Sequence, residues 1–175
     1  MAGKRKSNKI VLDHGRWIEV DVSTPLNPTA VMKINKADWK ILQAMKIGRI
    51  STICNTQNTP YARCYCKGKS YLIHRILRSK TKEIDHKNHN GLDNRRSNLR
   101  TCTVNENQRN RILQKNNTSG HKGVFKCKKS KDDRWIAHIQ HNKKRIYLGT
   151  FLTLSDAIDR RKKAEVKYFG QFAFK

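Results

Sequence analysis

Acidic residues are scarce in this chain. Only 13 Asp and Glu stand against 39 Lys and Arg, which gives a formal net charge of +26 over 175 residues. An excess of this size is not incidental to a soluble surface and predicts a polyanionic partner. Because neutralising phosphates releases their counterions, we expect nucleic-acid binding that is strong at low salt and weakens steeply as salt rises.

Long apolar runs are also lacking. No segment approaches the roughly 20 apolar residues that a membrane span needs. The basic N-terminus MAGKRKSNK is not followed by the apolar stretch of an export signal. We therefore expect no membrane partner and a cytoplasmic protein.

Aromatic residues make up only 7% of the chain, and several are expected in the core. Proteins that recognise single-stranded RNA stack its bases on exposed aromatic side chains. Few aromatics remain for such stacking, so double-stranded DNA is favoured over RNA as the partner.

The five cysteines are an odd number, and in the cytosol we expect reduced thiols without a structural disulfide. Cys64 and Cys66, with Cys54 and Cys102 as further candidates, raise the alternative of a zinc site. Zinc ligands usually stand about two to four residues apart. Cys64 and Cys66 instead belong to a predicted strand with alternating residues, in which both side chains share one face. Buried thiols are the favoured interpretation, and zinc stays the alternative.

The N-terminal third predicts a small α+β scaffold over 10–70, after a disordered basic arm at 1–9. Alternation at 16–22 predicts a strand, and strands are also predicted at 49–53, 61–66 and 71–73. Asn35 is the predicted N-cap of a short helix that ends at Gly48. Its predicted apolar stripe consists of Ile34, Ile41, Leu42 and Met45.

The central part brings together a candidate catalytic set. A strand at 83–86 carries Asp85 and His86, and a loop at 87–97 is rich in Asn, Asp, Gly and Arg. After a second strand at 99–103, the capping-box spacing from Thr103 to Glu106 predicts a helix that carries Asn107. We expect Asp85, His86 and Asn107 to converge.

The chemistry of this set suits phosphodiester hydrolysis. Carboxylate and amide oxygens, from Asp85 and Asn107, are hard ligands that suit Mg²⁺ or Mn²⁺, with water and phosphate filling the other positions. His86 is then the candidate general base that activates a water molecule. No small-molecule cofactor is expected.

These residues resemble the His-Asn-His (HNH) nucleases, in particular the phage and intron homing endonucleases. The resemblance rests on HRIL at 74–77, IDHKN at 84–88, GLDNRRSNLR at 91–100 and NENQ at 105–108. It implies a ββα-metal fold over 71–114, with Asp85 and Asn107 as metal ligands, His86 as the base and Asn98 as the asparagine that braces the catalytic loop. Asn107 replaces the third His of many relatives, which favours an oxygen-liking metal over zinc. A phage gene would place the protein in a bacterial cytoplasm.

Four other polar residues of this region have competing interpretations. Asn98 and Asp93 could only satisfy the loop backbone, and for Asp93 this interpretation is favoured. His74 either packs beside the strand or touches DNA. His89, in the Asn-rich loop, is expected to be exposed.

After a linker at 115–122, residues 123–175 predict a three-stranded antiparallel sheet covered by one helix. The alternating segments are 123–128, 134–140 and 144–150, and the helix runs from a Ser155 cap to Phe169, with Gly170 at its end. The side chains predicted to face the helix are Trp135, Ala137, Ile139, Ile146 and Leu148.

This part resembles the AP2/ERF DNA-binding domains through SGHKGV at 119–124, WIAHI at 135–139, YLGTF at 147–151 and KYFG at 167–170. The resemblance implies a sheet that lies in the major groove. Phe125 and Cys127 stand where plant relatives carry arginines, and Arg160 with Arg161 suggests extra phosphate contacts or looser helix packing. The predicted DNA-binding residues are Arg134, His138, Gln140, Arg145, Tyr147, Lys122 and Arg111.

The sequence thus predicts an α+β, metal-dependent DNA endonuclease of homing type. The alternative is a DNA-binding protein or regulator that has lost cleavage. No coiled-coil or apolar dimer seam is visible, so we expect a monomer that nicks one strand.

Overall fold

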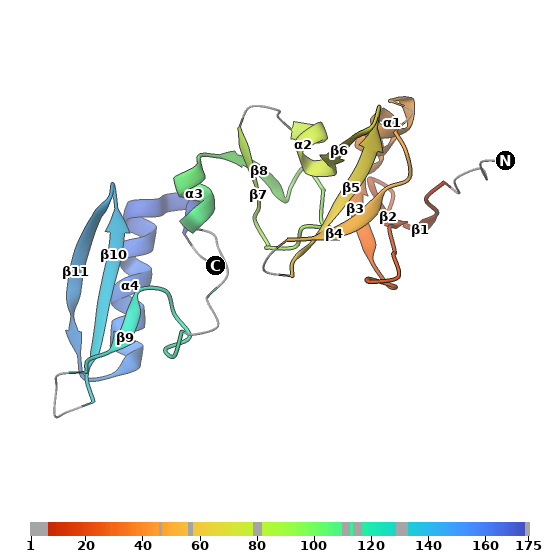
Figure 1. Ribbon diagram of the computed structural model, residues 1–175. Coiled ribbons are helices and arrows are strands. Elements are labelled where there is room, and N and C mark those ends of the chain that lie inside the picture. The colour runs from red at the N-terminus through yellow and green to blue at the C-terminus, as the bar shows by residue number, and fades with distance from the viewer. Residues whose placement is uncertain are drawn as a thin grey trace. The chain divides into compact units, whose positions relative to one another are not determined.

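The computed structural model describes residues 7–45, 47–55, 58–78, 82–109, 113, 117–128 and 133–173. The chain divides into two compact units, Met1–Val104 and Asn105–Lys175 (Figure 1). This division falls before the predicted linker at 115–122, and the functional domain boundaries stay predictions. None of the helices in the described ranges has the length and apolar character needed to span a bilayer.

The first unit begins with an antiparallel sheet of β1 (Ile10–Asp13), β2 (Trp17–Asp21) and β3 (Val31–Asn35), in that order. The alternation predicted around Ile18 and Val20 is confirmed, because both side chains are buried on the inner face of β2. The helix α1 (Lys36–Ala44) follows β3 directly and buries Leu42.

A second antiparallel sheet consists of β4 (Ser51–Cys54), β5 (Pro60–Cys66) and β6 (Lys69–Leu72), with β5 in the centre. A short helix, α2 (Ile73–Arg78), continues from β6. Cys64 is fully buried on β5, as predicted for a strand thiol, whereas Cys54 is exposed and Cys66 is half-buried. Within the described residues no three His, Cys, Asp or Glu side chains cluster to hold a metal.

One apolar core joins both sheets of this unit. Ile18, Met32 and Ile34 from the first sheet pack in the same cluster as Ile50 and Ala62 from the second. The cluster also contains Leu92, which belongs to the loop after β7. The core therefore fixes the loop to both sheets.

Several predictions for this unit are wrong in detail. Asn8, placed in the disordered arm, donates from Nδ2 to the Asp21 and Ile50 carbonyls at 2.7 and 2.8 Å and so ties β2 to the start of β4. The predicted stripe of α1 fails at Ile41 and Met45, which are about half exposed, because only one narrow side of this short helix meets the core. The helix also ends at Ala44, before Gly48.

The central hairpin was predicted closely. It consists of β7 (Glu83–His86) and β8 (Leu99–Cys102), paired antiparallel so that Asp85 stands opposite Arg100 and His86 opposite Leu99. The helix α3 (Val104–Arg109) begins directly after Thr103, as the capping-box spacing predicted. The chain order is thus strand, loop, strand, helix.

The second unit contains the predicted antiparallel meander, with β10 (Trp135–His141) between β9 (Val124–Lys126) and β11 (Lys144–Phe151). The long helix α4 (Leu154–Phe169) packs along one face (Figure 1). The inward residues are as predicted, since Ala137 and Ile139 are buried, and the partly buried Trp135, Ile146 and Leu148 pack in the same clusters.

The cap of α4 differs from the prediction. Thr153, and not Ser155, is the N-cap, and its hydroxyl accepts a hydrogen bond from the Asp156 amide at 3.1 Å. Gly170 ends the helix at a positive φ, as predicted, and begins a short 3₁₀ turn, η1 (Gly170–Phe172).

We expect Gly123 and Gly120 to respond differently to alanine. Both have φ near +70°, so each substitution costs about 1–2 kcal/mol of backbone strain. At Gly123 the new Cβ would also overlap the His138 carbonyl oxygen and approach Arg161 Nε, which adds about 1–3 kcal/mol. Hydrogen exchange of 133–151 should therefore show much weaker protection in Gly123→Ala than in Gly120→Ala. Equal protection would mean that the close approach at Gly123 is not a constraint.

Candidate active site

Asp85 and His86 occupy the end of β7, where the strand passes into the long polar loop. Both side chains are buried, each with 6% of its surface exposed. Consecutive residues of a strand point to opposite faces, so the two groups contact different surroundings. The carboxylate lies against β8, and the imidazole lies against β5 and α2.

Arg100 is the charged partner of Asp85. It stands opposite Asp85 across the β7–β8 ladder, and its Nε and Nη2 lie 2.8 and 2.6 Å from the same carboxylate oxygen, Oδ2. A buried carboxylate requires such a partner, because desolvation otherwise strongly disfavours the charge. Sequence analysis missed Arg100. The signal was the opposite charge at the paired position, which becomes visible only once the strand register is known.

His86 belongs to a cluster of three rings. Its centroid lies 4.8 Å from that of His74 and 5.7 Å from that of Tyr61, with the rings edge to face in both pairs. Tyr61 and His74 also contact each other, with centroids 5.8 Å apart. Of the two interpretations of His74, packing beside the strand is therefore the one the structure supports, since only 5% of this residue is exposed.

Burial sets the protonation of both imidazoles. It lowers the pKa of His86 to about 4, although the Asn94 side chain and the charges of Asp85 and Asp93 act in the opposite direction. It lowers the pKa of His74 to about 3, and the charge of Arg75, with that of His86 when His86 is protonated, adds to this effect. Both rings are consequently neutral at neutral pH, the state in which an imidazole can accept a proton.

The polar loop after His86 is held together by Asp93 and Asn98. Asn98 donates from Nδ2 to the Asp93 carbonyl at 2.8 Å and accepts from the Asn88 amide at 3.1 Å, so it links the two ends of the loop. The Asp93 carboxylate accepts from Asn88 Nδ2 at 2.9 Å and forms an ion pair with Arg95 at 2.7 Å. Asn98 therefore bonds to backbone groups of the loop, whereas the Asp93 carboxylate bonds to the side chains of Asn88 and Arg95. A catalytic role for Asn98 stays a prediction.

The same loop is paired to the N-terminal sheet. The Lys33 amide on β3 donates to the Leu92 carbonyl at 2.9 Å, and the Asn94 amide donates to the Lys33 carbonyl at 2.8 Å. Arg96 adds a second attachment, since its guanidinium lies 2.6 Å from Asp38 on α1 and its amide donates to Asn35 Oδ1 at 2.8 Å. Asn35 thus uses its side chain for the loop instead of capping α1.

Asn107 lies on α3, which belongs to the second unit from Asn105 onward. Its convergence with Asp85 and His86 stays a prediction. The donors fit Mg²⁺ or Mn²⁺ by their chemistry, because Asp85 is a fixed carboxylate and an amide oxygen is an equally hard ligand. Magnesium commonly takes only one or two protein oxygens and leaves the other positions to water and phosphate.

The predicted DNA-binding residues of the sheet occupy its outward face. His138 on β10 pairs with Tyr147 on β11, and Gln140 pairs with Arg145. Phe125 of β9 stacks on His138 with centroids 5.1 Å apart, and the Arg145 guanidinium lies 5.6 Å from the Phe125 ring. The resemblance places Phe125 where plant relatives carry arginines, and its alternation with the buried Val124 also indicates this outward face.

The remaining DNA-binding predictions have different surroundings. Arg134 is exposed just before β10. Lys122 lies in the loop before β9, and its ammonium donates to the Arg109 carbonyl at 2.9 Å. Arg111 lies outside the described residues. Ser119, in the loop before β9, is buried and its hydroxyl donates to the Val124 carbonyl at 2.6 Å.

Residues 79–109 match the model of a protein family described as HNH endonuclease. The match spans β7, the polar loop, β8 and α3, and therefore includes Asp85, His86, Asn98 and Asn107. No curated protein and no solved structure matches the chain. The comparison supports an HNH nuclease that acts on DNA.

We expect Asp93→Asn to lower the free energy of unfolding by about 2–3 kcal/mol at pH 7, because it removes the charge from a buried hydrogen-bonded ion pair. The control Glu83→Gln breaks an exposed pair with Arg75 and should cost less than about 1 kcal/mol. Urea unfolding monitored by tryptophan fluorescence measures both, since Trp17 lies against Arg95.

The difference between wild type and Asp93→Asn should depend on pH. Burial raises the pKa of Asp93, but the hydrogen bonds and charge of Arg95 outweigh burial and hold that pKa below its usual value. The stabilisation is therefore complete above the unfolded pKa of about 3.9 and is lost as the pH falls further. A difference that stays constant down to pH 2 would contradict this assignment.

Proposed function

We propose that this chain is a metal-dependent DNA endonuclease of homing type that hydrolyses phosphodiester bonds at a site held by its C-terminal sheet. The observation that carries the proposal is the buried pair of Asp85 and His86 at the start of the braced loop, within the residues that match the HNH endonuclease family. The match supports the nuclease. The metal, the homing type and the role of the sheet go beyond this match and are part of the proposal.

His86 has the properties of the general base. Its ring is neutral at neutral pH and is held by Tyr61 and His74, so its orientation is set before DNA binds. In the proposed reaction His86 accepts a proton from the water that attacks the phosphorus, and the phosphodiester bond to the 3′ oxygen breaks. A fixed base avoids reorientation during the reaction, which favours catalysis.

Asp85 and Asn107 would hold Mg²⁺ or Mn²⁺, which would stabilise the charge on the phosphate and on the departing 3′ oxygen. Arg100 holds the Asp85 carboxylate in place through its two contacts to Oδ2. The outward face of the second unit, with Arg145, His138 and Tyr147, supplies groups that can hydrogen-bond base edges.

We expect His86→Ala to reduce cleavage of supercoiled plasmid by about 10²- to 10⁴-fold, because it removes the proton acceptor. Affinity for DNA in EDTA should stay nearly unchanged. The matched control is His89→Asn, which removes a nearby imidazole at a positive φ that asparagine tolerates, and it should cleave like wild type.

Wild-type cleavage should require Mg²⁺ or Mn²⁺ and stop with EDTA. Full activity in His86→Ala would show that His86 is not the general base. Plasmid that is bound but never cut, with either metal, would favour the alternative of a DNA-binding protein without cleavage.

We expect Arg145→Ala to weaken binding to the cleavage site by about 1–3 kcal/mol and binding to random DNA by much less, because a base-reading arginine contributes mainly to discrimination. Lys162→Ala, which removes an exposed charge from α4, should weaken both equally if it acts at all. Fluorescence anisotropy in EDTA measures these affinities. Equal losses with Arg145→Ala would identify Arg145 as a phosphate contact.

A further inference from the structure

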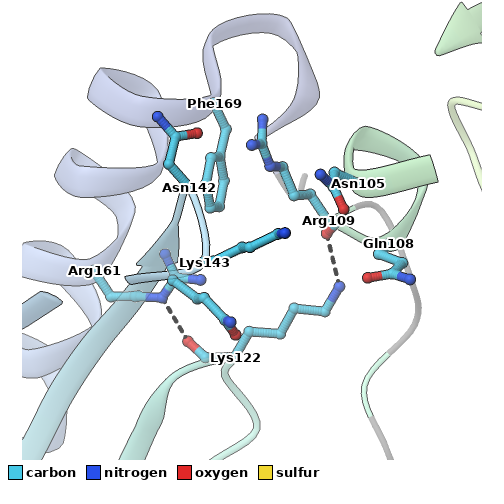
Figure 2. A pocket seen from close by; sticks show the side chains of 9 residues that line it. Asn105, Gln108, Arg109, Lys122, Asn142, Lys143, Arg161 and Phe169 are labelled. Carbon is cyan, nitrogen blue, oxygen red and sulfur yellow. Dashed lines mark hydrogen bonds between the residues drawn. The ribbon is translucent and has the colours of Figure 1, made fainter. Parts of the chain in front are cut away.

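The second unit contains a pocket of about 290 Å³ whose lining combines Lys122 and Gln140, which the sequence predicts to bind DNA, with residues of α3, α4 and the β10–β11 turn (Figure 2). It lies where the end of α3, the turn between β10 and β11 and the middle of α4 meet. Four of its lining side chains carry positive charge, namely Arg109, Lys122, Lys143 and Arg161. Among the described residues that line it there is no carboxylate.

Arg161 is the most constrained of these cations. Its side chain is only 9% exposed; Nη2 forms an ion pair with Glu165 at 3.0 Å and Nε donates to the Lys122 carbonyl at 2.9 Å. Its third nitrogen, Nη1, is buried and has no hydrogen-bond partner among the described residues. An unsatisfied buried donor is unfavourable, so an acceptor in the pocket would stabilise this arrangement.

The neutral lining supports an anion with several oxygens. Asn105, Gln108, Gln140 and Asn142 add amide groups that can donate to such oxygens. Lys122 is bonded to α3, since its ammonium donates to the Arg109 carbonyl. The Arg109 guanidinium in turn lies 4.5 Å from the Phe169 ring. The cations are therefore held near one another, and the Glu165 carboxylate acts on the charges of Arg161 and Lys122.

The turn that carries Lys143 also supports an anion-binding site. Asn142 and Lys143 form a two-residue turn with φ of 49° and 63°, between the paired residues His141 and Lys144. Turns of this kind favour glycine at the second position. Lysine at this position works against the backbone preference and places an ammonium group in the pocket.

We propose that this pocket binds a phosphate group of the DNA backbone, an inference that rests on the proposed function. Closely placed cations and amide donors match the charge and the several acceptor oxygens of a phosphate. The bound phosphate would connect α3, at the end of the HNH match, to α4 and the β10–β11 turn. It also gives Arg161 a role in phosphate binding, beside its packing on the sheet.

The test begins with Lys143→Gly, because glycine suits the positive φ of this turn and the fold should be kept or slightly stabilised. Arg161 is a poorer first choice, since its removal leaves Glu165 buried without its ion-pair partner at 3.0 Å. The control is Lys144→Ala, which removes an equal charge from the next, exposed residue that does not line the pocket.

The full chain is titrated with a random duplex in EDTA over a series of salt concentrations. In Lys143→Gly the slope of log K against log salt should fall in magnitude by about 0.9, the value for one lost phosphate contact, and in Lys144→Ala it should stay at the wild-type value. Equal slopes in all three proteins, or the same decrease in both variants, would overturn the proposal.

A second titration uses inorganic phosphate, and calorimetry measures its binding. Phosphate binding that Lys143→Gly weakens, together with unchanged DNA slopes, would overturn the DNA assignment and identify a free phosphate as the ligand. EDTA prevents cleavage, so the titration measures DNA binding alone. If the protein cuts plasmid but the salt slopes of the variants are unchanged, only the phosphate-pocket proposal is wrong. A protein that shows the slope change but never cuts plasmid fails only the proposed cleavage.

Discussion

The pairing of the polar loop with β3 is the interaction on which the candidate active site depends. Lys33 exchanges backbone hydrogen bonds with Leu92 and Asn94 on either side of Asp93, and Leu92 enters the core of the first unit. A loop of this composition would otherwise be free to move. The pairing fixes it to the sheet and so fixes the end of β7, where Asp85 and His86 lie.

Burial has opposite consequences for the two neighbours on β7. Asp85 is buried in an ion pair with Arg100 across the ladder. His86 lies among Tyr61 and His74, and the cost of burying a cation keeps its ring neutral. One strand end thus presents a charged oxygen ligand and a neutral proton acceptor, and the alternation of a β-strand is what separates their environments.

Local patterns predicted the elements around the site well. The strand at 83–86, the turn-rich loop and the helix start after Thr103 follow from residue preferences that act within a few positions. The inward side of the C-terminal sheet followed from simple alternation at Trp135, Ala137 and Ile139. The stripe of α1 could not be predicted from periodicity, because Ile41 and Met45 are apolar at helical spacing and yet stay about half exposed.

By itself the sequence determined the basic character of the protein, the HNH motif and the order of its elements, because charge, turn chemistry and periodicity are properties of neighbouring residues. The tertiary structure decided which groups surround them. Arg100 reaches Asp85, Arg96 reaches Asp38, and Arg161 is buried at a pocket of cations through strand register and core packing. These contacts join residues far apart in the chain, and no local pattern encodes their distance.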